Sequence, residues 1–244
     1  MKISIITACY NSSHTLEKTI QSVLSQTHTD IEFIVIDGGS KDGTLDIIKQ
    51  YSDEVSVWIS EPDRGIYDAL NKGVALATGD LIGFLHADDV YASPNILEHI
   101  ANLATHNNVV YGDLQYVSEN GTVIRNWVSG IFEFKKLKRG WMPPHPTLYV
   151  KRELYSEVGV FNLDYKIAGD YDFMLRLLSM PNLKVGYLPE LVVLMRVGGA
   201  SNKSIKNIIQ KSKEDYKALK YNKIGGFWTL FLKNFGKLHQ FIKK

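Results

Sequence analysis

The chain has 244 residues, of which 45% are hydrophobic and 22% charged, a balance typical of a soluble globular protein with one large domain or two small ones. The single cysteine, Cys9, excludes an internal disulfide and fits a reducing compartment. No run of about 18 apolar residues exists and the apolar start of the chain is too short for a signal peptide, so we expect no membrane-spanning helix.

The net charge of +2 conceals an uneven distribution. Residues 203–244 hold 11 of the 28 basic residues and 2 of the 26 acidic ones, so this segment carries +9 and the rest of the chain −7. Such a split points to an anionic partner for the segment, either a membrane or a nucleic acid.

The first half of the chain predicts alternating strands and helices. Apolar runs at residues 2–7, 31–36, 55–59 and 81–85 predict strands. Residues 14–24, 42–50 and 66–77 predict helices, the first after the cap residues Asn11-Ser12-Ser13 and the second capped by Asp42. This alternation over roughly 90 residues implies a parallel sheet covered by helices.

The second half of the chain has a different pattern. Residues 109–117 and 122–127 alternate as strands of a hairpin around Glu119-Asn120-Gly121. A rigid Pro-rich loop is expected over residues 141–146, a helix over 170–179, and two short strands over 184–188 and 192–197.

Three of the expected strands end on polar residues. The first strand leads to Thr7, Tyr10 and Asn11, the second ends on Asp37, and the fourth leads to His86-Ala87-Asp88-Asp89. Because ligands of open parallel sheets bind beyond the carboxyl ends of the strands, we expect the site at this edge.

Asp88 and Asp89 are adjacent carboxylates after a buried strand. Two such charges disfavour joint ionisation unless a cation compensates them, and Mg²⁺ or Mn²⁺ with oxygen ligands and substrate phosphates fits that role. The alternative is a solvated helix cap before Pro94.

Four further positions can contact a nucleotide. Asp37 can accept a hydrogen bond from a base edge such as the uracil imide, or it can simply start a turn. Tyr10 can stack on the base and Thr7 can bond to it, or both can serve local packing. Arg64 can reach a diphosphate, or it can form a surface ion pair.

Asp170 opens a predicted helix, where a carboxylate interacts favourably with the helix dipole. It is also a candidate general base that takes a proton from an attacking hydroxyl. For Asp172 we expect a structural hydrogen bond. The phosphate-loop, dinucleotide-fingerprint and serine-hydrolase motifs are missing from the sequence, which argues against those three classes.

In this order and spacing, the motifs resemble the inverting family-2 glycosyltransferases of the GT-A fold, over roughly residues 2–200. The motifs are Thr7-Ala8-Cys9-Tyr10-Asn11, Val35-Ile36-Asp37-Gly38-Gly39-Ser40-Lys41-Asp42-Gly43-Thr44, Gly65-Ile66-Tyr67-Asp68-Ala69-Leu70-Asn71-Lys72-Gly73, Ala87-Asp88-Asp89 and Gly169-Asp170-Tyr171-Asp172.

The resemblance implies an α/β fold with a Rossmann-like, mostly parallel central sheet flanked by helices, a smaller antiparallel sheet on the acceptor side, and C-terminal helices. We expect a catalytic domain over residues 1–202, with a nucleotide-sugar half (1–110) and an acceptor half (111–202). A basic helical extension follows over residues 203–244.

The resemblance also implies a role for each matching residue. Thr7, Tyr10, Asn11 and Asp37 would hold the nucleoside; Arg64, Asn71 and Lys72 would lie near the nucleotide or brace its loop; Asp88 and Asp89 would hold Mn²⁺ or Mg²⁺ and the diphosphate; Asp170 would be the base; and Arg196 would begin a loop, 196–201, that closes over the donor. Two departures from the family pattern are His86, where many members have Asp, and Gly169, where many have Glu.

The implied function moves one sugar from a nucleotide-diphosphate sugar, preferably a UDP-sugar, to a hydroxyl of a glycan or lipid-linked acceptor, with inversion, in cell-surface polysaccharide biosynthesis. The Gln-x-x-Arg-Trp motif of processive synthases is missing, which favours single-sugar transfer. The alternatives are a sugar nucleotidyltransferase and a non-catalytic nucleotide-sugar binding protein of the same fold.

The basic segment predicts an amphipathic helix over residues 225–244. Its apolar face holds Phe227, Phe231, Phe235, Leu238 and Ile242, and its polar face holds Lys233, Lys237, Gln240 and Lys244. Such a helix suits an anionic membrane surface, which would place a cytoplasmic enzyme on the inner face of the membrane. The alternatives are docking on the catalytic domain or on a second copy in a homodimer; we expect no nucleic-acid partner.

Overall fold

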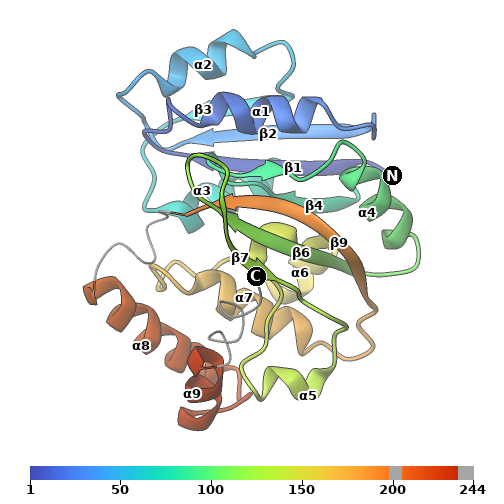
Figure 1. The fold of residues 1–244 in the computed structure, drawn as a ribbon, viewed down its shortest axis with the longest axis vertical. Helices are drawn as coiled ribbons and strands as arrows, with labels where there is room; N and C mark the ends of the chain where they lie inside the picture. Colours follow the sequence, from blue (N-terminus) through green and yellow to red (C-terminus); the bar gives the residue numbers. More distant parts are fainter. Residues whose placement is uncertain (198–204, 236–244) are drawn as a thin grey trace.

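The computed structural model describes residues 1–197 and 205–235. Its centre is one nine-stranded sheet with the order β3-β2-β1-β4-β8-β6-β9-β5, to which β7 is added through β6 (Figure 1). The strands are β1 (Ile3–Cys9), β2 (Ile31–Asp37), β3 (Val57–Ser60), β4 (Leu81–Phe84), β5 (Val90–Tyr91), β6 (Val109–Val117), β7 (Val123–Trp127), β8 (Tyr149–Lys151) and β9 (Val185–Arg196).

The four strands of the first half are parallel, as the sequence predicts. β1 pairs with both β2 and β4, and β2 pairs with β3. All seven residues of β1 are buried, which matches its continuous apolar run. The carboxyl ends of these strands therefore meet at one edge of the sheet.

The strands of the second half continue this sheet, whereas a smaller separate sheet was expected. β8 pairs antiparallel with β4 and with β6, and β6 pairs parallel with β9. The two short strands expected over 184–188 and 192–197 are one strand, β9. The pairing of β6 with β9 shifts register next to Gly112, where a Cβ would lie 3.1 Å from two carbonyl oxygens of β9. This irregularity accommodates Pro189, which has no N–H to donate.

Helices cover both faces of the sheet, and each face has its own core. One core packs α1 (Leu16–Leu24), α2 (Thr44–Gln50) and α4 (Ile96–Ala104) on the sheet. The other packs α3 (Ile66–Leu76), α6 (Leu154–Val158) and α7 (Gly169–Leu178). β1, β2 and β4 contribute alternate residues to the two cores, as the period of two requires.

The remaining helices lie at one end of the molecule. α5 (Phe134–Leu137), α8 (Ile205–Tyr221) and α9 (Phe227–Phe235) are grouped there (Figure 1). Elsewhere, a 3₁₀ turn (His145–Thr147) interrupts the predicted rigid loop. α8 buries Ala218 and Leu219 in the core shared with α7. In the parts of the chain that the structure describes, no helix has both the length and the apolarity to cross a bilayer. The predicted helix residues beyond 235 lie outside the described residues.

Candidate active site

A cavity of about 1210 Å³ lies at the carboxyl-end edge of the parallel strands. Residues from β1, the turn after β4, the β6–β7 hairpin, α7 and α8 line it. Five residues proposed from sequence are among them: Tyr10, Asn11, Asp88, Asp170 and Arg196. Six others do not line it: Thr7, Asp37, Arg64, Asn71, Lys72 and Asp89.

Of the three predicted site residues near the end of β1, Tyr10 and Asn11 line the cavity and Thr7 does not. Tyr10 is 62% exposed, and Asn11 has the left-handed φ of 49° that turns the chain away from the strand. Thr7 is fully buried, and its hydroxyl donates to the Leu85 carbonyl at 2.7 Å. Thr7 thus ties β1 to the segment after β4, and its hydroxyl proton is already in use.

Asp37 is fully buried, and its carboxylate is occupied by the turn that follows it. It accepts hydrogen bonds from the Ser40 amide at 3.1 Å and the Ser60 hydroxyl at 2.6 Å, and another from the Ser40 hydroxyl. The Ser40 hydroxyl also accepts from the Asn11 amide at 2.8 Å. In this structure Asp37 therefore shapes the turn beside Asn11.

Arg64 points away from the cavity. Its side chain is 76% exposed and its guanidinium pairs with Asp68 at 3.1 Å. Lys72 contacts Glu61 at 2.8 Å and the Pro62 carbonyl at 3.2 Å, so it braces the loop before α3. Bracing was one of the two roles expected for these residues.

Asn71 joins α3 to the segment before α7. Its side chain donates to the Phe161 carbonyl at 2.8 Å and accepts from the Phe161 amide at 2.9 Å. It therefore also braces the framework of the site.

The two carboxylates of the acidic turn have different surroundings. Asp88 lines the cavity, whereas Asp89 is fully buried. One oxygen of Asp89 accepts the Arg196 amide at 3.2 Å, and the other has no hydrogen-bond partner in the described structure. Burial and the nearby Asp88 raise the pKa of Asp89 well above its ordinary value.

A pair of histidines lies between the acidic turn and α7. The rings of His86 and His145 are 6.0 Å apart, and His145 stacks on Phe84 at 5.1 Å. Nδ1 of His86 and Nε2 of His145 are buried without a hydrogen-bond partner in the described structure. Burial lowers the pKa of His145 to about 4, so its ring is neutral near pH 7.

Asp170 lies beside Tyr67 of α3. The Tyr67 hydroxyl lies 3.2 Å from Oδ1 of Asp170 and 2.7 Å from the Ile167 carbonyl. A Cβ on Gly169 would lie 2.8 Å from the Tyr67 ring. The Gly169 departure from the family pattern is therefore what admits Tyr67 beside the carboxylate.

Asp172 has the structural role expected for it. It is buried and accepts hydrogen bonds from Arg176 Nε at 3.0 Å and from the Asn222 side chain at 2.9 Å. It thereby fixes α7 and the end of α8 to one another.

Residues 4–162, more than half of the chain, match the family model described as glycosyl transferase family 2. The chain belongs to this family. A PGL/p-HBAD biosynthesis glycosyltransferase of Mycobacterium bovis is 34% identical over 206 residues, which are 82% of this chain and 78% of the relative. An uncharacterized glycosyltransferase of Mycobacterium tuberculosis is 34% identical over 190 residues, 71% of this chain and 68% of the relative.

Solved structures confirm the GT-A fold of this family-2 glycosyltransferase. S. aureus TarS 1-349 in complex with UDP-GlcNAc has a TM-score of 0.69 at 18% identity, covering 92% of this chain and 66% of that one. The mannosyltransferase PcManGT from Pyrobaculum calidifontis, in complex with GDP-Man and Mn2+, has a TM-score of 0.68 at 17% identity, covering 98% and 70%. The chain spans 39% of a longer TarS chain. Family membership decides against the nucleotidyltransferase alternative and identifies an enzyme.

Several cavity residues of this glycosyltransferase were not predicted from the sequence. Arg125 lies over the rings of Tyr116 and Trp127 in the β6–β7 hairpin, at 5.1 and 5.2 Å. Lys211 and Asp215 of α8 also line the cavity, so the expected extension forms part of its wall. Tyr67 lies in the motif Gly65–Gly73, so its place in that motif could have indicated a role in the site. Arg125, Lys211 and Asp215 lie in no motif that indicates one.

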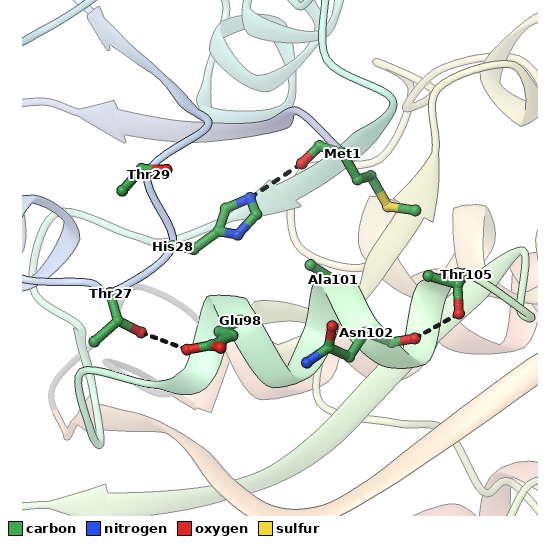
Figure 2. Close-up of a pocket in the computed structure, with 8 residues that line it drawn as sticks. All are labelled: Met1, Thr27, His28, Thr29, Glu98, Ala101, Asn102 and Thr105. Atoms are coloured by element: carbon green, nitrogen blue, oxygen red, sulfur yellow. Dashed lines mark hydrogen bonds between the residues drawn. The ribbon is translucent and has the colours of Figure 1, made fainter.

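A smaller pocket of about 360 Å³ lies by the amino end of β1 (Figure 2). The Thr27 hydroxyl donates to Glu98 at 3.0 Å, and the His28 ring is bonded to the Met1 carbonyl at 3.0 Å. These polar groups are already engaged within the protein, and the pocket lies at the opposite end of β1 from the cavity lined by Asp88 and Asp170.

Proposed function

We propose that this family-2 glycosyltransferase transfers one sugar from a nucleotide-diphosphate sugar, preferably a UDP-sugar, to a hydroxyl of a glycan or lipid-linked acceptor, with inversion. The observation that carries the proposal is the single cavity lined by Tyr10, Asn11, Asp88 and Asp170. At about 1210 Å³ it exceeds the usual volume of a site for one small ligand, and so has room for donor and acceptor together.

Tyr10 is the proposed stacking partner of the base, because its ring is exposed at the edge of the cavity. Asp37 stays the proposed acceptor for an N–H of the base, which requires that the Ser40 hydroxyl gives way. Thr7 and Arg64 are proposed to act indirectly, since neither lines the cavity. The UDP-GlcNAc complex of TarS supports a UDP-sugar donor, and the GDP-Man complex of PcManGT makes GDP-sugars the alternative.

The donor set fits a divalent cation such as Mn²⁺ or Mg²⁺. Asp88 offers a carboxylate to the cavity, and Asp89 has a buried oxygen without a hydrogen-bond partner among the described residues. The described residues contain no cluster of three or more His, Cys, Asp and Glu that would complete a protein shell. Donor phosphate oxygens and water would fill the remaining positions, as is usual for Mg²⁺. Bound there, the cation neutralises charge that develops on the diphosphate.

Asp170 is the proposed general base. The Tyr67 hydroxyl lies 3.2 Å from Oδ1, and no hydrogen bond within the described structure reaches Oδ2, which can take the proton of the acceptor hydroxyl. Asp170 lies in the first turn of α7, at the positive end of the helix dipole. A single base and a single displacement imply inversion at the anomeric carbon.

The test compares Asp170→Asn with the exposed neighbour Asp164→Asn. With Mn²⁺, a panel of UDP- and GDP-sugars and hydroxyl acceptors, Asp170→Asn should lower nucleoside diphosphate release about 10³-fold. Donor binding, measured as a thermal shift, should stay near that of the unmodified chain. Normal turnover by Asp170→Asn would show that Asp170 is not the general base. If the unmodified chain transferred no sugar from any nucleotide sugar tested, the proposed function would be wrong.

The proposed pathway is cell-surface glycan synthesis. It is supported by the similarity to the PGL/p-HBAD biosynthesis glycosyltransferase of Mycobacterium bovis. The proposed location is cytoplasmic, at the inner face of the membrane, where lipid-linked acceptors are available.

A further inference from the structure

The helix α9 packs against α7 and α8 through its one charged residue. Nζ of Lys233 lies 2.6 Å from Oδ1 of Asp215 and 3.1 Å from the centre of the Tyr171 ring. The Thr229 hydroxyl donates to the Lys138 carbonyl at 2.9 Å on the same side. Lys233, expected on the polar face of a membrane-binding helix, is instead buried in an ion pair, so this side of α9 docks on the protein as the alternative interpretation expected.

These inward contacts turn the aromatic side of α9 outward. Trp228 is 74% exposed and Phe227 66%, and Phe231 and Leu232 are also exposed. Contiguous exposed aromatic side chains are unusual on a soluble surface and mark a site of interaction.

The charges displayed by α8 and by the loop before α9 are all positive. The two acidic residues of α8 face the catalytic domain: Glu214 accepts the Ile167 and Ala168 amides at 2.8 and 2.9 Å, and Asp215 pairs with Lys233. The exposed ionisable side chains of the described part of residues 205–235, tyrosines apart, are lysines: Lys206, Lys213, Lys217, Lys220 and Lys223.

The outer face of α8 mixes these lysines with apolar residues. Ile209, Lys213, Tyr216 and Lys220 follow helical spacing, and all four are exposed. α8 and α9 lie at the same end of the molecule (Figure 1). We call the exposed residues of α8 and α9 the aromatic–lysine surface.

We propose that the aromatic–lysine surface docks on an anionic phospholipid bilayer. Aromatic side chains insert at the boundary between headgroups and acyl chains, and lysines are attracted to the negative surface potential. A second copy of the chain is the poorer occupant, because a two-fold interface would bring like-charged lysine faces together. The charge complementarity therefore favours the bilayer.

The relevance of membrane docking to catalysis rests on the proposed transfer to a lipid-linked acceptor. α8 supplies Lys211 and Asp215 to the cavity wall on its inner side. A bilayer bound to its outer side lies about one helix diameter, roughly 10 Å, from the cavity. A lipid-linked acceptor would then need to rise only a short distance to reach Asp170.

The test is co-sedimentation of the full chain with vesicles of phosphatidylcholine alone or mixed with phosphatidylglycerol. The chain should bind the mixed vesicles, and added salt should weaken binding. Phe227→Ser with Trp228→Ser should lower partitioning about tenfold or more. Lys213→Glu with Lys220→Glu should lower it about fivefold or more per lysine at low salt.

Matched controls lie on α1 and α2, at the other end of the molecule (Figure 1). Leu24→Ser removes an exposed apolar side chain, and Lys18→Glu with Lys49→Glu reverses two exposed charges. Both should leave vesicle binding unchanged, which separates a local surface from a general effect of charge or hydrophobicity.

Two outcomes would overturn the proposal. One is vesicle binding by the surface variants equal to that of the unmodified chain. The other is a dimer in solution that becomes a monomer in the Phe227/Trp228 variant, which assigns the surface to a second copy. Release of nucleoside diphosphate with a water-soluble acceptor should stay within about twofold in all variants, so failure of membrane docking and failure of the proposed function give different results.

Discussion

Buried polar side chains at the edge of the sheet fall into two groups that differ in their hydrogen bonding. Thr7 and Asp37, at the ends of β1 and β2, have all their donors or acceptors engaged by the protein. His86 and His145, beside Asp170, each keep a buried ring nitrogen without a partner in the described structure. Such an atom costs about 1–3 kcal/mol and is rare in folded proteins.

The difference separates residues that shape the framework of the site from residues with unused hydrogen-bonding groups. Thr7 bonds to the segment after β4, and Asp37 bonds to the turn beside Asn11. His86 and His145 line the cavity with a buried, unpartnered nitrogen each, which we expect a bound substrate to engage. Substitutions in the first group should change stability, and substitutions in the second should change activity.

Glu32 is buried near the amino end of β2, at the opposite edge of the sheet, and its hydrogen bonds are also satisfied. It gives the largest expected effect on stability. Burial alone would raise its pKa, but hydrogen bonds from Lys2, Ser4 and Thr78 lower it to about 2. Its stabilisation is complete above the ordinary pKa of 4.5 and is lost as pH falls toward 2. The full span is on the order of 3 kcal/mol.

Urea unfolding of the unmodified chain and of Glu32→Gln between pH 7 and pH 3 measures this contribution. The stability advantage over Glu32→Gln should shrink as the pH falls. A constant difference across this range would show that the Glu32 charge is not stabilised by its partners.

Gly169→Ala should change both stability and activity, because it acts on Asp170 through the packing of Tyr67. The added Cβ, 2.8 Å from the buried Tyr67 ring, must displace the ring. We expect a stability loss of about 1–3 kcal/mol. Tyr67 would also leave Oδ1 of Asp170, so kcat should fall at least tenfold while KM for the donor changes little.

Gly226→Ala is the matched control, since a Cβ there meets nothing within 4 Å. It should leave stability and kcat near those of the unmodified chain. If Gly169→Ala lowered stability without changing kcat, the Tyr67 contact would not position the base.

Much of the fold could be predicted from the sequence because local pattern determined it. The parallel strands of the first half follow continuous apolar runs, and the β6–β7 hairpin follows its turn residues. The sequence did not predict that β8, β6 and β9 continue the same sheet, because strand neighbours are set by long-range packing. The single strand β9 was also missed, because Pro189 indicates a break that the bulge next to Gly112 absorbs.

Chemistry and position along the chain together placed Tyr10, Asp88 and Asp170 at one edge of the sheet, and all three line the cavity, while their roles stay predictions. Position along the chain could not show that Arg64 turns outward to Asp68 or that Asp89 is buried. Nor could it show that α8 returns to line the cavity with Lys211 and Asp215, since that depends on packing across the whole chain.

Thr7→Val tests the group of residues whose hydrogen bonds are made within the protein. It removes the buried hydrogen bond to the Leu85 carbonyl without a large change in shape. We expect a loss of about 1–2 kcal/mol in urea unfolding and an unchanged KM for the donor. Tyr10→Ala should do the reverse, because Tyr10 is exposed: it should raise KM and leave stability unchanged. A raised KM for the donor in Thr7→Val would indicate that Thr7 contacts the nucleoside directly.

His145→Phe gives the smallest expected change in stability. It tests the group of residues that keep an unpartnered ring nitrogen. Phenylalanine keeps the ring contacts with Phe84 and Phe161 and removes the unpartnered nitrogen. Relief of that nitrogen should stabilise the fold by up to about 1 kcal/mol, while nucleoside diphosphate release falls because a contact to substrate is lost. His99→Phe is the control, since His99 is paired with Glu190 at 2.8 Å and its replacement should bring no gain. Stabilisation by His145→Phe with full activity would mean that the open nitrogen is not used by the substrate, and the distinction between the two groups would then concern stability alone.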